Sequence, residues 1–279
     1  MAPARGTRPE TPKAMLKLYD HPFSPYAQKV KIALREKAQP FEAPLPQGIG
    51  AGGAAGEFVE ANPRAEVPAL IDGAVKVFDS TVILEYVEDK WPDPPLLPKG
   101  AAERARVRMI EEVMDTHFEP INWGLGEIRN FKRAKGALAE AIERRAAEQT
   151  QGYFRWLERQ LGSRDWFNGE TFGWGDIAVV PYLNGSRGLG HSPAAGSRLA
   201  GWLARVNERP SVAATVKDIA DMLKGGGLGM NDVARLVEEG VFKREYRDHR
   251  LEWMIKVGGF EVVADGLKRD NIRFGPDLN

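Results

Sequence analysis

The chain of 279 residues contains no cysteine and only four histidines. The absence of cysteine excludes disulfide bonds, thiolate metal ligands and a nucleophilic thiol within the protein. The histidines stand at no spacing typical of paired metal ligands; they are His21, His117, His191 and His249. We therefore expect no catalytic metal, and any thiol chemistry must come from a bound small molecule.

A net charge and a long apolar run are also missing. Lys+Arg and Asp+Glu both number 39, whereas proteins that bind nucleic acid or anionic membranes usually carry an excess of basic residues. No apolar run approaches the roughly 18 residues of a membrane span, and no apolar core of a signal peptide is present. These absences predict a cytoplasmic protein whose partners include neither nucleic acid nor a membrane.

Proline and glycine divide the chain into regions. Hydrophobic residues make up 43% of the chain, enough for a substantial core, and four prolines in nine residues at Trp91–Lys99 interrupt regular structure. Strand and helix patterns alternate before this segment, and helical patterns follow it. The last region carries too many aromatic residues for a disordered segment, so we expect it to pack on the body. The predicted regions are a disordered leader (1–14), a mixed α/β domain (15–92), a linker (93–100), an all-helical domain (101–223) and a C-terminal extension (224–279).

A strand, a turn and a helix are predicted at the start of the α/β domain. Leu16 and Leu18 alternate with a polar residue as in a strand, and apolar residues at helical spacing begin at Tyr26. Pro25 suits the first helical position, which places Ser24 at the N-cap. A hydroxyl there lies in the positive field of the helix start, where an anion such as a thiolate is favoured. Plain capping of the helix is the alternative interpretation of Ser24.

A second informative segment runs from Ala61 to Ile71. Pro68 cannot donate a hydrogen bond within a sheet, which predicts that it stands at a strand start, an edge or a bulge. A cis peptide bond before it would turn the backbone of Val67 outward to pair with an extended peptide. An ordinary trans proline is the alternative, because only about 5–6% of X–Pro bonds are cis.

The next elements are a hairpin and a helix. Asp72-Gly73 is a turn dipeptide, and Val75–Phe78 is the returning strand. Asp79 and Ser80 then open a helix. Ser80 either caps this helix or, with the amides of the first turn, binds a carboxylate.

Four segments in this order resemble the glutathione transferase family, in its cytosolic, serine-type branch. They are His21-Pro22-Phe23-Ser24 with the helix that follows, Asn62-Pro63-Arg64-Ala65-Glu66-Val67-Pro68-Ala69-Leu70, the Asp79-Ser80 pair, and Gly169-Glu170 to Asp176. The resemblance covers about Met15 to Leu223 and suggests a bacterial-like member with an extended C-terminal tail. It implies a thioredoxin-like N-terminal domain followed by an all-helical C-terminal domain, glutathione as cosubstrate, no metal, and a homodimer.

The resemblance also implies roles for individual residues. Ser24 would donate a hydrogen bond to the glutathione sulfur, and the Val67 backbone, held by a cis Pro68, would pair with the cysteinyl part. Asp79 would bind the γ-glutamyl ammonium group, and Ser80 would bind the γ-glutamyl carboxylate. No general base is required.

Three positions depart from the family pattern. Gly173 replaces a capping serine or threonine, which weakens a folding signal. Ala65 replaces the usual glycine. Glu66 stands where a neutral or basic residue often binds the glycyl end of glutathione, so the glycyl contacts are not defined by the sequence.

The electrophile would be small and apolar or aromatic, and its pocket would lie between the two domains. Each candidate wall residue has a role in the core as its alternative, and these residues are Tyr26, Phe118, Trp123, Trp174 and Tyr182. General conjugation is the expected reaction. A glutathione-dependent lyase or etherase, a dehalogenase and a peroxidase remain open, as does a non-catalytic glutathione- or ligand-binding protein.

Overall fold

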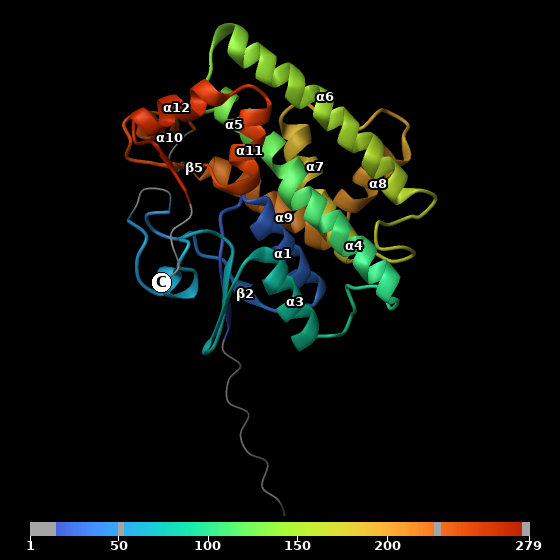
Figure 1. Ribbon diagram of the computed structural model, residues 1–279. Helices are drawn as coiled ribbons and strands as arrows, with labels where there is room; N and C mark the ends of the chain where they lie inside the picture. Colours follow the sequence, from blue (N-terminus) through green and yellow to red (C-terminus); the bar gives the residue numbers. More distant parts are fainter. Residues whose placement is uncertain (1–14, 50–52, 226–229, 275–279) are drawn as a thin grey trace, which may run out of the picture.

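A four-stranded sheet forms the centre of the N-terminal domain in the computed structural model, which describes residues 15–49, 53–225 and 230–274 (Figure 1). The strand order is β2-β1-β3-β4. β2 runs parallel to β1, whereas β3 is antiparallel to both β1 and β4. The strands are β1 (Leu16–Tyr19), β2 (Phe41–Glu42), β3 (Ala69–Asp72) and β4 (Val75–Phe78).

Helices cover both faces of this sheet. Successive residues of a strand point to opposite faces, and Leu18 and Leu70 accordingly pack with α1 (Pro25–Glu36) and α3 (Ser80–Lys90) in the main core. On the other face, Ala69 and Ile71 pack with the short helix α2 (Glu57–Ala61). The strands, hairpin and helices predicted from the sequence in this domain are confirmed, and the fold is thioredoxin-like.

The second domain is helical, and its longest helix lies on the outside of the molecule (Figure 1). The sequence predicts one helix from about 101 to 115 or 118. The structure instead continues it through a π-helical turn, Met114–Phe118, into a further helix that the apolar pattern did not reveal. The helices are α4 (Ala101–Val113), α5 (Glu119–Arg129), α6 (Gly136–Leu161), α7 (Trp174–Gly188), α8 (Arg198–Asn207) and α9 (Pro210–Lys224). No helix in the described ranges is both long and apolar enough to span a membrane.

Helix α1 lies between the sheet and the helical domain, and its polar side chains are buried there. Lys29, Lys31 and Lys37 are each at most 3% exposed. Lys29 pairs with Glu111 of α4 at 2.7 Å, and Lys37 pairs with Glu88 of α3 at 2.6 Å. Buried charges need such partners, so these pairs hold α1 against α4 and α3.

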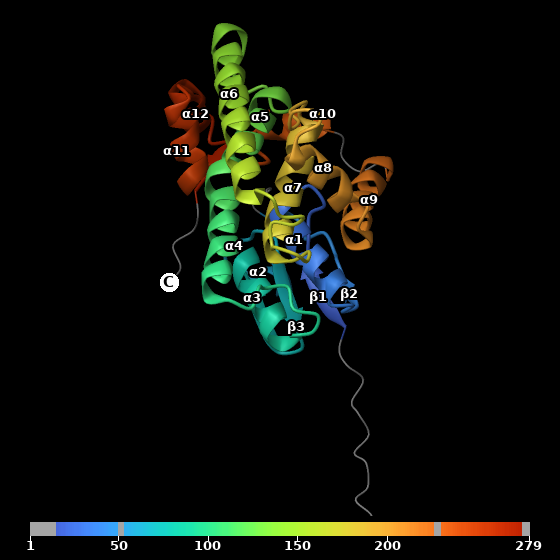
Figure 2. The same cartoon turned by 90° about the vertical axis from the view of Figure 1, so that its right-hand side faces the viewer.

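The C-terminal extension packs on the body, as its aromatic content predicts. Its elements are α10 (Met230–Glu238), β5 (Arg244–Glu245), α11 (Asp248–Lys256), α12 (Phe260–Lys268) and β6 (Ile272–Arg273), with β5 parallel to β6. Figure 2 shows α11 and α12 beside α5 and α6. Tyr246 and Trp253 join a second core with Ile121 and Leu125 of α5. Phe260, in contrast, is 64% exposed.

Two predicted segments connect or precede these domains. The residues between α3 and α4, 91–100, contain no helix or strand. The predicted leader, 1–14, lies outside the described residues.

Candidate functional site

The strand register places three candidate segments at one edge of the sheet. Tyr19, the last residue of β1, pairs with Ala69, and Ala69 also pairs with Phe78, the last residue of β4. The turn to α1 follows Tyr19, the Val67–Pro68 segment precedes Ala69, and Asp79 follows Phe78. Segments from three distant parts of the sequence therefore converge where an extended peptide could add to the sheet.

Ser24 is the N-cap of α1, as predicted. Its Oγ accepts a hydrogen bond from the backbone N–H of Ala27 at 3.3 Å. Because this bond uses a lone pair of the hydroxyl, the hydroxyl hydrogen can still be donated to an anion. His21 is held locally, since its Nδ1 accepts from the backbone N–H of Phe23 at 3.3 Å, and burial lowers its pKa. A histidine kept neutral in this way fits a structural role.

The peptide bond between Val67 and Pro68 is cis, which confirms what the family resemblance implied. The loop before it is fixed by Asn62, whose side-chain amide donates to the backbone oxygen of Glu66 at 2.7 Å. Ala65 has a φ of 53°, in the left-handed region. This conformation explains the usual glycine at that position, because glycine adopts it without steric cost.

Asp79, rather than Ser80, caps α3. The Asp79 carboxylate accepts from the backbone N–H of Thr81 at 3.0 Å and of Val82 at 3.4 Å, and its φ is 73°. Ser80 is the first helical residue and is 4% exposed. The interpretation of Ser80 as the capping residue was therefore wrong, because the longer carboxylate one position earlier reaches the free amides. Its proposed carboxylate-binding role is unaffected.

The predicted wall residues of the electrophile pocket differ in exposure. Phe118, Trp174 and Tyr182 are at most 1% exposed and present almost no surface to a ligand. These three residues therefore belong to the core. Tyr26 and Trp123 are half-buried. These two remain candidates for contact with a substrate.

A buried polar network lies behind Tyr26. Its hydroxyl donates to the backbone oxygen of Asp115 at 3.0 Å, and the Tyr182 hydroxyl donates to the Asp115 carboxylate at 2.6 Å. Burial raises the pKa of Asp115 to about 6, and the nearby Lys29 opposes that rise. The network links α1 to the π-helical turn and α7, and so fixes the first turn of α1.

Sequence patterns did not reveal which residues of the C-terminal extension reach this site. Arg247 pairs with Glu66 at 3.1 Å, next to Val67. His249 Nε2 lies 3.4 Å from the Tyr26 hydroxyl. The sequence of the tail gave no signal for these contacts; only its aromatic content indicated that it folds.

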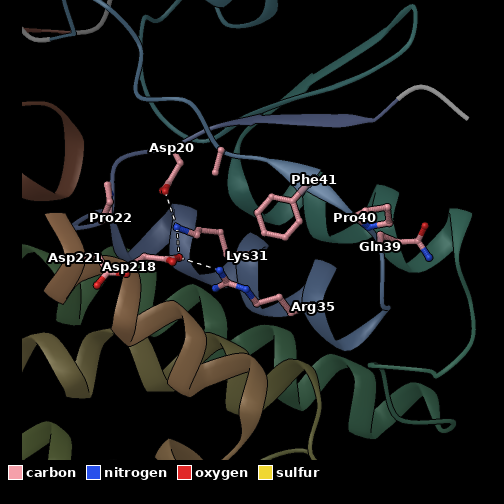
Figure 3. Close-up of a pocket in the computed structure, with 10 residues that line it drawn as sticks. Asp20, Pro22, Lys31, Arg35, Gln39, Pro40, Phe41, Asp218 and Asp221 are labelled. Carbon is pink, nitrogen blue, oxygen red and sulfur yellow. Dashed lines mark hydrogen bonds and ion pairs between the residues drawn. The ribbon is translucent and has the colours of Figure 1, made fainter. Parts of the chain in front are cut away.

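A separate pocket of about 510 Å³ lies between α1, β2 and α9 (Figure 3). Lys31 crosses its floor and pairs with Asp20 at 2.7 Å and with Asp218 at 2.5 Å. The pocket is lined by Asp20, Pro22, Lys31, Arg35, Gln39, Pro40, Phe41, Ala43, Asp218 and Asp221. None of the predicted site residues lines it. Its cations are already paired with carboxylates, so we do not assign the site to it.

Family models match segments of both domains. Residues 18–95 match the family model for the glutathione S-transferase N-terminal domain, and residues 137–205 match the model for the C-terminal domain. The glutathione S-transferase U28 of Arabidopsis thaliana is 30% identical over 206 residues, which are 70% of this chain and 85% of that protein. The chain belongs to the glutathione S-transferase family.

Two further relatives carry different names. A rice glutathione S-transferase solved in complex with glutathione is 29% identical, with a TM-score of 0.60 over 76% of this chain and 97% of that chain. A stringent starvation protein A homolog from Haemophilus ducreyi is 24% identical over 206 residues, covering 73% of this chain and 91% of that protein.

Within the described ranges, no group of three or more His, Asp or Glu side chains is placed to hold a metal ion.

Proposed function

We propose that the protein is a glutathione transferase in which Ser24 stabilises the thiolate of bound glutathione. The observation that carries the proposal is the position of the Ser24 hydroxyl, at the N-terminus of α1 and at the same sheet edge as Val67 and Ser80. The thiolate would attack a small apolar or aromatic electrophile bound between the two domains, with Tyr26 and Trp123 as candidate contacts. The rice relative, which binds glutathione, supports the choice of cosubstrate.

The expected size of the effect is sufficient for catalysis at neutral pH. A free thiol has a pKa of roughly 8.5, and each unit of depression requires about 1.4 kcal/mol in favour of the thiolate. A hydrogen bond to a charged acceptor contributes about 1.5–3 kcal/mol, and a helix N-terminus adds about 0.3–1 kcal/mol. Together they lower the thiol pKa by about one to two units or somewhat more.

The remaining contacts follow the sheet edge. The Val67 backbone pairs with the cysteinyl part of glutathione, as an added antiparallel strand would. Ser80 and the first-turn amides of α3 bind the γ-glutamyl carboxylate, and Asp79 meets its ammonium group. As in many members of this family, the protein would act as a homodimer.

The test is the thiol pKa of bound glutathione, followed by its ultraviolet thiolate absorbance across pH, in the unaltered protein and in Ser24→Ala. We expect the pKa to rise by at least one unit in Ser24→Ala, with turnover reduced at least tenfold. An unchanged pKa and turnover would show that another group activates the thiol.

A second candidate is a non-catalytic glutathione- or ligand-binding protein, favoured by the relative that is named a starvation protein rather than a transferase. Retention on glutathione resin without turnover of any chromogenic electrophile would support it. Turnover with an aryl halide, an ether, an alkyl halide or a peroxide would separate conjugation from the lyase, dehalogenase and peroxidase alternatives.

A further inference from the structure

The start of α11 and the strand before it lie against the cis-proline segment. Arg247 Nη2 is 3.1 Å from Glu66 Oε2, and Arg247 Nε is 2.7 Å from Glu245 Oε1. Arg273 binds the other oxygen of Glu245 at 2.8 Å. The side chain of Arg247 remains 26% exposed. This arginine thus lies between the side chains of Glu66 and Glu245 and can still contact a ligand.

In the arginine–glutamate pairs that join the extension to the body, arginines outnumber glutamates by one. Each glutamate in this region pairs with at least one arginine, and Glu127 pairs with both Arg133 and Arg244 at 3.4 and 2.6 Å. Five arginines and four glutamates take part in these pairs among the described residues: Arg133, Arg244, Arg247, Arg250 and Arg273 with Glu66, Glu119, Glu127 and Glu245. A ligand carboxylate would balance the excess.

Glu66 adds to this excess because it is held in its neutral form. Burial, followed by the neighbouring Glu245 carboxylate, raises the pKa of Glu66 to about 8. Its Oε1 is buried, and the protonated Glu66 carboxyl group hydrogen-bonds the Glu245 carboxylate. At neutral pH, Glu66 therefore keeps a proton that it shares with Glu245, and it does not repel a nearby anion.

The direction of a bound glutathione follows from the sheet edge. With its γ-glutamyl end at Ser80 and its cysteinyl residue antiparallel to Val67, the third residue comes to lie beside the residue that precedes Val67. That residue is Glu66, and the side chain that contacts it from the extension is Arg247.

We propose that Arg247, supplied by the C-terminal extension, binds the glycyl carboxylate of glutathione and makes the extension a part of the glutathione site. The inference rests on the proposed function, because it takes glutathione as the ligand. It also accounts for the acidic Glu66 at a position where family members often carry a neutral or basic residue: here the cation comes from a distant segment of the chain.

The experiment compares binding of glutathione with that of its glycine monoethyl ester, which lacks the glycyl charge, by isothermal titration calorimetry on the full-length protein. We expect the unaltered protein to bind glutathione at least tenfold more tightly than the ester. In Arg247→Met the two affinities become equal within about twofold, and Arg247→Lys keeps part of the preference.

Two variants serve as matched controls. Arg273→Met removes an arginine from the same cluster, and Arg235→Met removes one that pairs with Glu239 on the surface of α10. Both variants should retain the tenfold preference for glutathione over the ester. If Arg273→Met loses this preference as fully as Arg247→Met does, the assignment to Arg247 is overturned. An undiminished preference in Arg247→Met would overturn the inference alone. Absence of glutathione binding by the unaltered protein would overturn the proposed function together with it.

Discussion

The indole ring of Trp253 lies directly on the backbone of Gly124, so that a methyl group on this glycine would come within 2.0 Å of the indole Cζ3. A helix of the body and a helix of the extension thus meet at a site that has no room for a side chain. We predict that Gly124→Ala displaces Trp253 and lowers the free energy of unfolding by about 1–3 kcal/mol, as overpacking does. Urea denaturation followed by tryptophan fluorescence measures the change.

Gly126→Ala, two residues along the same helix, is the matched control. The nearest atom to an added methyl group there, Asn130 Nδ2, is 3.8 Å away. Alanine is favoured over glycine in a helix by about 1 kcal/mol, so this variant should be as stable as the unaltered protein or slightly more stable. Equal stabilities of the two variants would contradict the close contact.

Lys29 is a second position where one substitution tests the contact between the domains. Its Nζ lies 2.7 Å from Glu111 Oε1 and 2.6 Å from Asp115 Oδ2, all in the interior. Lys29→Met leaves two buried carboxylates without their cation, and we expect the free energy of unfolding to fall by about 3–5 kcal/mol. Lys217→Met removes a lysine whose side chain is 72% exposed, so it should leave the stability nearly unchanged. Differential scanning calorimetry of both variants measures the change in stability. A similar loss of stability in the two variants would contradict the prediction.

The Glu66 carboxyl predicts a pH dependence of stability. Its pKa is about 8 in the folded protein against 4.5 ordinarily. Between these values the folded protein keeps a proton that the unfolded chain releases, so the stability from Glu66 is full below about pH 4.5 and is lost as pH rises through 8. The slope reaches at most about 1.4 kcal/mol per pH unit.

Glu66→Gln removes this titration while keeping a neutral side chain. The stability of the unaltered protein relative to Glu66→Gln should therefore fall between pH 5 and 8, as measured by urea denaturation at each pH. Glu60→Gln is the control, because the side chain of Glu60 is 67% exposed. A pH profile of Glu66→Gln parallel to that of the unaltered protein would show that Glu66 does not carry the effect.

Asp176 receives four hydrogen bonds at the start of α7. Three come from backbone amides, those of Phe167, Asn168 and Gly173, and one comes from the indole of Trp202 at 2.8 Å. Asp176→Asn turns an N–H group toward these donors, and we expect a loss of about 3 kcal/mol in the free energy of unfolding. Asp89→Asn, at an exposed position of α3, is the control for chemical denaturation. A loss below about 0.5 kcal/mol in Asp176→Asn would refute the role of the carboxylate.

The sequence predicted those parts of the fold whose signals are local. Pro25 after Ser24 and the Asp72-Gly73 turn each act within a few residues, and both predictions are confirmed. The aromatic content of the extension predicted that it packs on the body, which is confirmed, but not which residues it contacts. The cis bond before Pro68 required the family resemblance, because an isolated X–Pro bond is usually trans.

The sequence did not predict contacts between distant segments. The pairing of Arg247 with Glu66 joins residues far apart in the chain. No sequence pattern indicates which arginine will pair with a glutamate so distant from it. Gly173 was interpreted as a weakened folding signal, yet a Cβ there would lie 2.3 Å from the backbone oxygen of Leu96. The close approach of the linker to α7, which only the structure shows, accounts for glycine at this position.

The contact between Arg247 and Glu66 also bears on how the protein is made. Ribosomes release Ser24, Val67 and Ser80 from the exit tunnel long before residue 247, so a nascent chain can complete its sheet and most of its helices while the glycyl side of the cleft is still open. Under the proposed role of Arg247, high affinity for glutathione would arise only late in translation.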